Sequence, residues 1–284
     1  MVEREPHGGG SGGRSILSAT EAHEDRGRQT SRWDLYLVTG SLVFLSVIAW
    51  LYVWRTPDEG MAVGVLTRPP SGDAMSTMES GSGMSFTLFI STWIVMMIAM
   101  MFPAVVPVVL LFDRWRRTRH RSVASTVSFI VGYLAVWGSA GLLVYAALVG
   151  IETQVENSTT AVTLGGICLI AAGLYQLSPL KTACLNHCRS PLGLVMQHSQ
   201  HLGRGLRGPF RVGVLHGAYC LGCCWALMVV LIVLGLMNLG WMAAVSALIL
   251  VEKTLPAGQG FGRVSGVGIA LAGATVLVTA SGVI

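Results

Sequence analysis

Long apolar stretches separated by short polar segments make up most of the chain. Six of them reach the roughly 17–25 residues that a helix needs to cross a bilayer: Leu35–Val53, Phe86–Phe112, Val123–Leu148, Ala161–Leu180, Val212–Met237 and Val264–Ile284. A seventh, Trp241–Val251, is shorter, and we expect it to continue to about Leu255 after a tight turn at Asn238–Gly240. Because lipid offers the backbone no hydrogen-bonding partner, each span must be helical. The pattern predicts an all-α, polytopic transmembrane bundle of about seven spans, six at least.

Composition and the remaining segments fit this division. Of 284 residues, 52% are hydrophobic and 12% are charged, unlike a soluble globular domain. Residues 1–33 combine glycines with scattered charges, which predicts a disordered cytoplasmic tail. Residues 34–54 form the first transmembrane helix, and the polar, Gly- and Pro-containing residues 55–85 form an outside loop. Residues 86–284 form the main bundle.

Basic residues gather in three connecting segments, whereas the Ile151–Thr160 loop has two glutamates and no Lys or Arg. The basic residues lie before the first span, in the linker Asp113–Ser122 and after the fourth span, and include Arg26, Arg28, Arg32, Arg114, Arg116, Arg117, Arg119, Arg121, Lys181, Arg189, Arg204, Arg207 and Arg211. Under the positive-inside rule this alternation predicts a cytoplasmic N-terminus and an outside C-terminus. The net charge of +5 then reflects membrane topology, and we expect no nucleic-acid partner.

Five of the six cysteines fall in two short clusters, each with a histidine inside it or one helical turn before it. The first cluster begins just after Pro179, which ends the fourth span, and the second lies in the fifth span. The candidate ligands are Cys184, His187 and Cys188 in the first cluster, and His216, Cys220, Cys223 and Cys224 in the second. Both clusters belong to the cytoplasmic side of the predicted topology. They can therefore meet at one face of the bundle.

Helical spacing places candidate ligands of the second cluster on one face of the fifth span. At about 100° per residue, His216, Cys220 and Cys223 lie within about 60° of one another on the fifth span. Thiolate and imidazole are ligands for copper and zinc, so a metal site is the leading hypothesis.

Methionines in the second span add softer candidate ligands. Met97, Met100 and Met101 fall within about 100° of arc near the membrane midplane. Thioether sulfur suits Cu(I), which favours copper over zinc. A haem held through His216 instead of a free ion is the less favoured cofactor. The competing interpretation is that methionine fills gaps between packed helices.

Two further features leave alternatives open. The C-x2-C spacing of Cys220 and Cys223 occurs in zinc sites and in thiol–disulfide catalysts, so spacing does not separate metal binding from redox chemistry. Glu252 and Lys253 close the short sixth helix. An ionisable pair near the bilayer indicates a functional site, but Lys253 at a helix end can also extend to the interface.

At these motifs the sequence resembles a bacterial family of predicted metal-binding integral membrane proteins, a domain of unknown function. The resemblance covers about Ser85 to Gly262 and rests on the following residues: Met97–Met101 with Pro103 and Pro107, Leu180–Lys181, Cys184, Cys188, Arg189, Pro191, Gly213, Gly217, Cys220–Trp225 and Glu252–Lys253. It implies a metal in a bacterial cytoplasmic membrane, without identifying the ion or its use.

We therefore expect a membrane protein that binds a soft transition metal, Cu(I) or alternatively zinc, and conveys or delivers it. No nucleotide-binding loop, acidic phosphorylation motif or Ser/His/Asp arrangement is present, which favours a binding protein over an enzyme or energised pump. Expected partners are the lipid bilayer, the metal ion and a metallochaperone or membrane enzyme complex. The alternatives are a membrane thiol–disulfide oxidoreductase and an accessory subunit of a larger membrane complex.

Overall fold

The computed structural model describes residues 36–55, 86–119, 121–152, 158–190, 193, 205–235 and 238–281. Within these residues the fold is all-helical and contains no strand. The chain divides into two compact units, Met1–Ser41 and Leu42–Ile284. The first unit contributes only residues 36–41 to the description, and the contacts below all lie in the second. The predicted tail at residues 1–33 and nearly all of the predicted loop at 55–85 lie outside the described residues.

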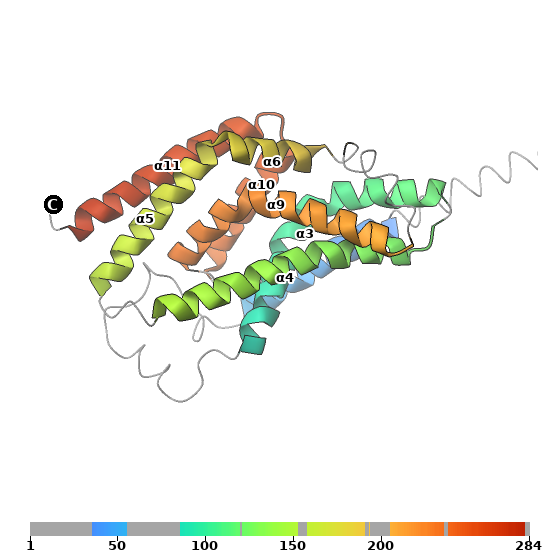
Figure 1. Ribbon diagram of the computed structural model, residues 1–284, viewed down its shortest axis with the longest axis horizontal. Helices are drawn as coiled ribbons and strands as arrows, with labels where there is room; N and C mark the ends of the chain where they lie inside the picture. Colours follow the sequence, from blue (N-terminus) through green and yellow to red (C-terminus); the bar gives the residue numbers. More distant parts are fainter. Residues whose placement is uncertain are drawn as a thin grey trace, which may run out of the picture. The chain divides into compact units, whose positions relative to one another are not determined.

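Six helices are long and apolar enough to cross a membrane. They are Tyr36–Arg55, α3 (Phe86–Thr118), α4 (Ala124–Glu152), α5 (Ser158–Leu177), α9 (Arg207–Leu234) and α11 (Gly258–Ala280). Two shorter helices, α6 (Pro179–Arg189) and α10 (Leu239–Thr254), complete the described elements (Figure 1). The six apolar helices agree with the six predicted spans, with ends shifted by a few residues.

The prolines of α3 shape its contact with the first helix. Pro103 has no N–H, so the carbonyl of Ala99 loses its usual helical donor. Ser46 Oγ donates to that carbonyl at 2.9 Å and Trp50 Nε1 donates to it at 3.0 Å. The first helix therefore satisfies a backbone group that the proline leaves open, and α3 remains one continuous helix.

Glycines let α4 and α9 approach closely. A Cβ at Gly213 would overlap the carbonyl of Phe129, and a Cβ at Gly217 would lie 3.0 Å from Val136. The contacts advance along both helices in the same direction, so α4 and α9 run parallel. Gly213 and Gly217 thus form a packing face between the two helices.

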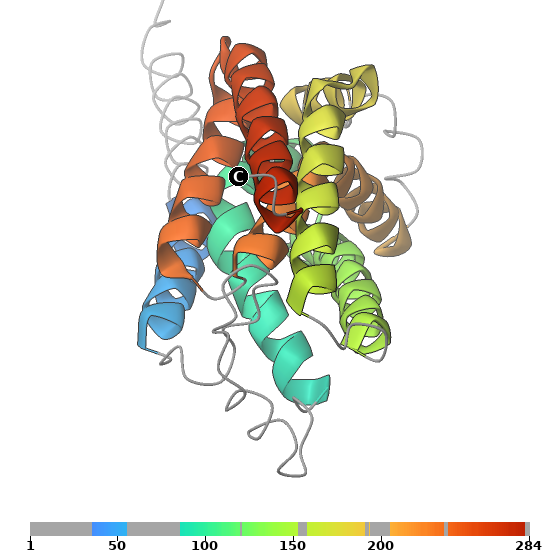
Figure 2. The ribbon, with the colours of Figure 1, turned by 90° about the vertical axis from the view of Figure 1, so that its left-hand side faces the viewer.

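Small residues also join α5 to α11, which lie side by side in both views (Figure 2). A Cβ at Gly173 would lie 2.6 Å from the Gly266 carbonyl oxygen, and a Cβ at Gly273 would lie 2.7 Å from that of Gly166. Here the contacts run in opposite directions along the two helices, so the pair is antiparallel. Gly266 therefore belongs to the face along which α11 packs on α5.

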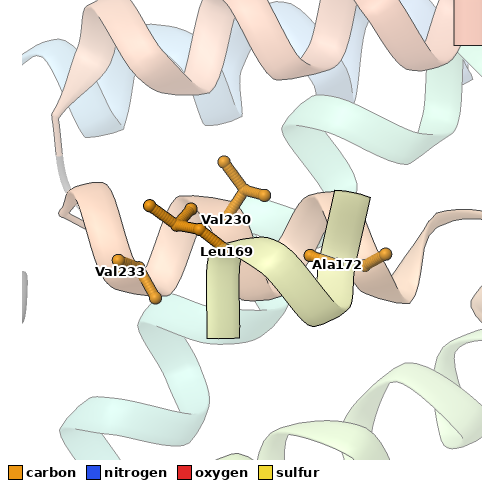
Figure 3. Close-up of a cluster of buried hydrophobic side chains, with 5 residues drawn as sticks. Leu169, Ala172, Val230 and Val233 are labelled. Atoms are coloured by element: carbon orange, nitrogen blue, oxygen red, sulfur yellow. The ribbon is translucent and has the colours of Figure 1, made fainter. Parts of the chain in front are cut away.

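A small apolar cluster packs α5 against α9 (Figure 3). Leu169 and Ala172 of α5 meet Ala226, Val230 and Val233 of α9, and all five are buried. This contact fixes the face that α9 turns toward α5, and the cysteines of α9 lie two to six residues before Ala226 in the chain.

The fourth span differs from its prediction at its C-terminal end. We expected it to reach Leu180, but α5 ends at Leu177 and Pro179 opens a separate helix, α6. Ser178 is extended, with φ −72° and ψ 149°, as the residue before a proline prefers. Its side chain caps α6 by accepting from the Lys181 N–H at 3.2 Å. The first cysteine cluster therefore lies on a helix that sequence reading treated as a linker.

The connection between α9 and α10 also differs. We predicted a turn at Asn238–Gly240, but α9 ends at Leu234, and Asn238 caps α10 by accepting from the Trp241 N–H at 3.1 Å. Gly240 lies inside α10. Gly235 ends α9 with a positive φ of 118°, which L side chains rarely adopt, and this explains why glycine occupies that position.

Candidate metal centre

The two cysteine clusters meet where α6 packs against α9. Cys188 Sγ of α6 lies 3.7 Å from Cys223 Sγ of α9. Cys188 is 8% exposed and Cys223 is 1% exposed, so the pair is shielded from solvent. No disulfide joins the cysteines among the described residues.

This separation suits a shared metal ion. With metal–sulfur bonds of ~2.3 Å, two sulfurs 3.7 Å apart subtend about 107° at the metal. That angle is close to tetrahedral and far from linear. The pair can thus supply two ligands of a three- or four-coordinate ion without large movement of either helix.

Cys184 lies one turn earlier on α6 and is half-buried. A Cβ at Gly222 of α9 would lie 2.8 Å from its sulfur, so the glycine leaves room for this thiol. On the other side of the same glycine, Tyr175 of α5 donates its hydroxyl to the Gly222 carbonyl at 2.6 Å. Gly222 is therefore the point where α5, α6 and α9 come together.

Cys220 lies deeper in the cluster and is 1% exposed. Lys253 Nζ of α10 donates to Cys220 Sγ at 3.0 Å, and the Tyr133 hydroxyl of α4 lies 3.2 Å from the same sulfur. Cys223 and Cys224 both donate their thiols to the Cys220 carbonyl, at 3.1 and 2.9 Å. Four helices, α4, α6, α9 and α10, thus contribute to the surroundings of the thiols.

The thiols on α6 have raised pKa values. Burial raises the pKa of Cys184, and the nearby Cys223 raises it further. Hydrogen bonds with Cys220 and Cys223 raise the pKa of Cys188 well above its usual value, and burial adds to this. Both thiols hold their protons near neutral pH, so binding a metal ion there would release protons.

A buried ion pair lies beside the thiols. Lys181 Nζ of α6 bonds Glu252 Oε1 of α10 at 2.7 Å, and Gln176 Nε2 of α5 donates to the same oxygen at 3.1 Å. The side chains of Lys181 and Glu252 are 3% and 2% exposed. A Cβ at Gly262 of α11 would lie 2.8 Å from the Glu252 carboxylate, so this glycine makes room for the pair.

Glu252 and Lys253 therefore face different partners. Lys253 contacts Cys220 on α9, while Glu252 pairs with Lys181 on α6. Sequence reasoning singled out Glu252 and Lys253 but counted Lys181 among the basic residues of a loop, and it missed Tyr133, Tyr175 and Gln176. Lys181 could have been found from the family resemblance, because the Leu180–Lys181 pair is one of the motifs on which that resemblance rests.

The two histidines occupy aromatic stacks. His187 is exposed, its ring stacks on Tyr219 at 4.5 Å, and its Nδ1 lies 2.9 Å from the Ala183 carbonyl. His216 is buried and stacks between Phe129 and Tyr133, with ring centroids 6.1 and 5.9 Å away. The role of either imidazole as a ligand stays a prediction.

The methionines of α3 are buried in the bundle. Met97 and Met101 are 0% exposed and Met100 is 2% exposed. Helix α3 packs mainly on α4 and α10, whereas the thiols lie at the contact of α6 with α9. Their burial agrees with the interpretation that these methionines fill gaps between packed helices. Their role as copper ligands stays a prediction.

Among the described residues, no group of three or more His, Cys, Asp or Glu side chains is arranged to hold a metal ion. The Cys188–Cys223 pair could supply two ligands, and other groups would have to complete the coordination. Cys220 is one described candidate, because its thiol interacts with that of Cys188.

Fold and site together define an all-helical protein with six helices able to cross a membrane and a buried thiol cluster between α6 and α9. The sequence matches, over residues 90–276, a family described as PpoB2, copper chaperone. The match covers more than half of the chain, so the protein belongs to this copper chaperone family. No curated protein and no solved structure matches it.

Proposed function

We propose that this protein is an integral membrane protein that binds Cu(I) at the Cys188–Cys223 pair and delivers it to a partner. The observation that carries the proposal is the 3.7 Å approach of two buried thiols from two different helices, in a member of a copper chaperone family. Thiolates are preferred ligands of Cu(I). Copper is the cargo here, so it must leave the site as well as enter it.

The arrangement suits a cargo that has to be released. Two thiols provide fewer ligands than a closed structural site, which uses four. Cys184 lies one turn from Cys188 and is half-buried, so it offers a thiol that an incoming or outgoing ion can reach first. Ligand exchange between neighbouring thiols would then move copper without any nucleotide-driven step.

The experiment is elemental analysis of the full chain, purified in detergent under anaerobic conditions after growth with copper. We expect close to one copper per chain in the wild type and a loss of most of it in Cys188→Ser/Cys223→Ser. The matched control is Cys168→Ser, which removes an exposed cysteine of α5 outside the two clusters and should keep full copper. Full copper in a well-folded Cys188→Ser/Cys223→Ser variant would refute the proposed site.

Thiol redox chemistry is the second candidate, because thiols 3.7 Å apart need little movement to form a disulfide. In that case each turnover would pass two electrons and two protons from Cys188 and Cys223 to an oxidant such as a partner's disulfide. Alkylation trapping in intact cells separates the two functions. A Cys188–Cys223 disulfide whose level follows the cellular redox state, in a protein purified without copper, would favour the oxidoreductase.

A further inference from the structure

We infer that Lys253 sets the charge selectivity of the thiol site, favouring a monovalent metal ion over a divalent one. The inference rests on the proposed metal-binding function and adds a determinant of ion choice. It starts from the contact between Lys253 Nζ and Cys220 Sγ, 3.0 Å apart. This contact brings a lysine from α10 into a thiol cluster built on α6 and α9.

The neighbouring carboxylate does not cancel this lysine's charge. Glu252 is adjacent in the sequence, but it pairs with another lysine: its Oε1 accepts from Lys181 at 2.7 Å and from Gln176 at 3.1 Å. The ion pairs of the described helices join Asp113 to two arginines and Glu252 to Lys181, and none includes Lys253. The ammonium group therefore faces sulfur, without a described carboxylate partner.

The end of α10 is held in this position by two contacts with α6. Glu252 is bound to Lys181, and Arg189 Nε donates to the Lys253 carbonyl at 3.4 Å. Arg189 also brings a second positive charge close to the last turn of α10. A lysine on an anchored helix end acts as a fixed charge.

Charge balance gives the direction of the selectivity. Two thiolates with Cu(I) carry a net charge of −1, which the ammonium group of one lysine neutralises. Two thiolates with Zn(II) are already neutral, so the same ammonium group leaves the site with a net charge of +1. For any number of thiolates, a fixed cation repels a divalent ion twice as strongly as a monovalent ion at the same place. Removing the cation must shift the preference toward the divalent ion.

The test compares the wild-type chain with Lys253→Leu and Lys253→Arg, all purified in detergent under anaerobic conditions. Leucine removes the charge without adding a sulfur ligand for Cu(I). Cu(I) affinity is measured against a chromogenic Cu(I) chelator and Zn(II) affinity against a zinc indicator. We expect Lys253→Leu to raise the ratio of Zn(II) to Cu(I) affinity at least tenfold, and Lys253→Arg to keep the wild-type ratio. Lys253→Gln repeats the neutral substitution with a polar side chain in case leucine impairs folding.

The possible outcomes separate this inference from the proposed function. If the wild type binds no Cu(I), or if its Cu(I) binding survives in Cys188→Ser/Cys223→Ser, the proposed function fails, and the inference fails with it. If the wild type binds Cu(I) at the thiols but a folded neutral variant keeps the wild-type ratio, only the inference is overturned. Two further outcomes would make Lys253 a structural residue and also overturn the inference. One is an equal loss of Cu(I) and Zn(II) binding in the neutral variants and in Lys253→Arg, and the other is a failure of both neutral variants to fold.

Discussion

Gly222 determines how closely α6 can approach α9. Its missing Cβ leaves room for Cys184, and its carbonyl accepts the Tyr175 hydroxyl. Cys188 lies one turn from Cys184 and Cys223 is the next residue after Gly222, so Gly222 lies at the contact that brings the two thiols within 3.7 Å of each other. The glycine between the cysteines of the C-x2-C spacing is therefore part of the site.

We expect Gly222→Val to separate the two clusters. The added side chain would meet Cys184 Sγ, and relieving that overlap pushes α6 outward at a cost of about 1–3 kcal/mol. The measurements are copper content, thermal unfolding and the rate at which a maleimide alkylates Cys188 and Cys223, which should rise. Gly268→Val is the control, because a Cβ at Gly268 in α11 meets nothing within 4 Å. Unchanged alkylation and copper content in Gly222→Val would contradict this role.

The sequence predicted which residue types form the site better than it predicted their geometry. The clustering of cysteines on one predicted side of the membrane showed that the two clusters could meet, but it did not show whether they touch or that Cys188 and Cys223 would be the residues in contact. Nothing in the spacing showed that Lys253 points to Cys220 or that Lys181 is buried, because both contacts join helices that are distant in the sequence. A lysine in a basic segment looks the same in a sequence whether it is solvated or paired.

At the level of elements, α6 is held in place from its first turn. Pro179 and the Ser178 cap fix where the helix begins, and two residues later Lys181 forms the buried pair with Glu252 of α10. Burying an ion pair is costly, and breaking one by removing a single partner is costlier still. The pair therefore fixes α6 relative to α10 more than it adds net stability.

Lys181→Met should destabilise the protein by about 3–5 kcal/mol, because it leaves the Glu252 carboxylate buried and without its countercharge. Adding Glu252→Gln should restore much of this loss, since a neutral amide can still accept from Gln176. Thermal unfolding of the singles and the double in detergent checks the order of stability. Arg263→Met, at an exposed position of α11, should change stability by less than about 0.5 kcal/mol. A double variant no more stable than Lys181→Met would contradict the pairing.

Apolar length predicted the six long helices because hydrocarbon thickness imposes a narrow range of lengths. The same criterion did not resolve α6, whose eleven residues include Lys181, Asn186, His187 and Arg189 and form no apolar stretch. The sequence showed that the fourth span ends near Pro179. That a new helix, α6, begins there depends on the Ser178 cap and on packing against α9.

In the second unit, residues from three other helices contact the same short segment of α9, residues 220–222. Tyr175 near the end of α5, Lys253 near the end of α10 and Cys184 on α6 all contact residues 220–222 of α9. That segment lies thirteen residues after Arg207, or about 20 Å along α9. Helix α10 thus runs back along only the second half of α9, and α11 starts there and runs antiparallel to α5.

These directions fix on which side of the membrane each end should lie. Helices α4 and α9 start on the same side as the basic segments that precede them, and α11 runs toward the end where α5 begins. With the basic side cytoplasmic, residue 122 should be inside and residue 281 outside.

Cysteines introduced one at a time as Ser122→Cys and Ser281→Cys, in a Cys168→Ser background, test this arrangement. Both serines are exposed, and the background protein shows the labelling of the native thiols. A membrane-impermeant maleimide should label Ser281→Cys in intact cells and Ser122→Cys only after the membrane is opened. Labelling of both in intact cells would refute opposite sides for these two positions. Labelling of Ser122→Cys alone in intact cells would show the opposite orientation, in which the basic ends of α4 and α9 face outward. That orientation would exclude copper delivery to a cytoplasmic partner for this thiol site.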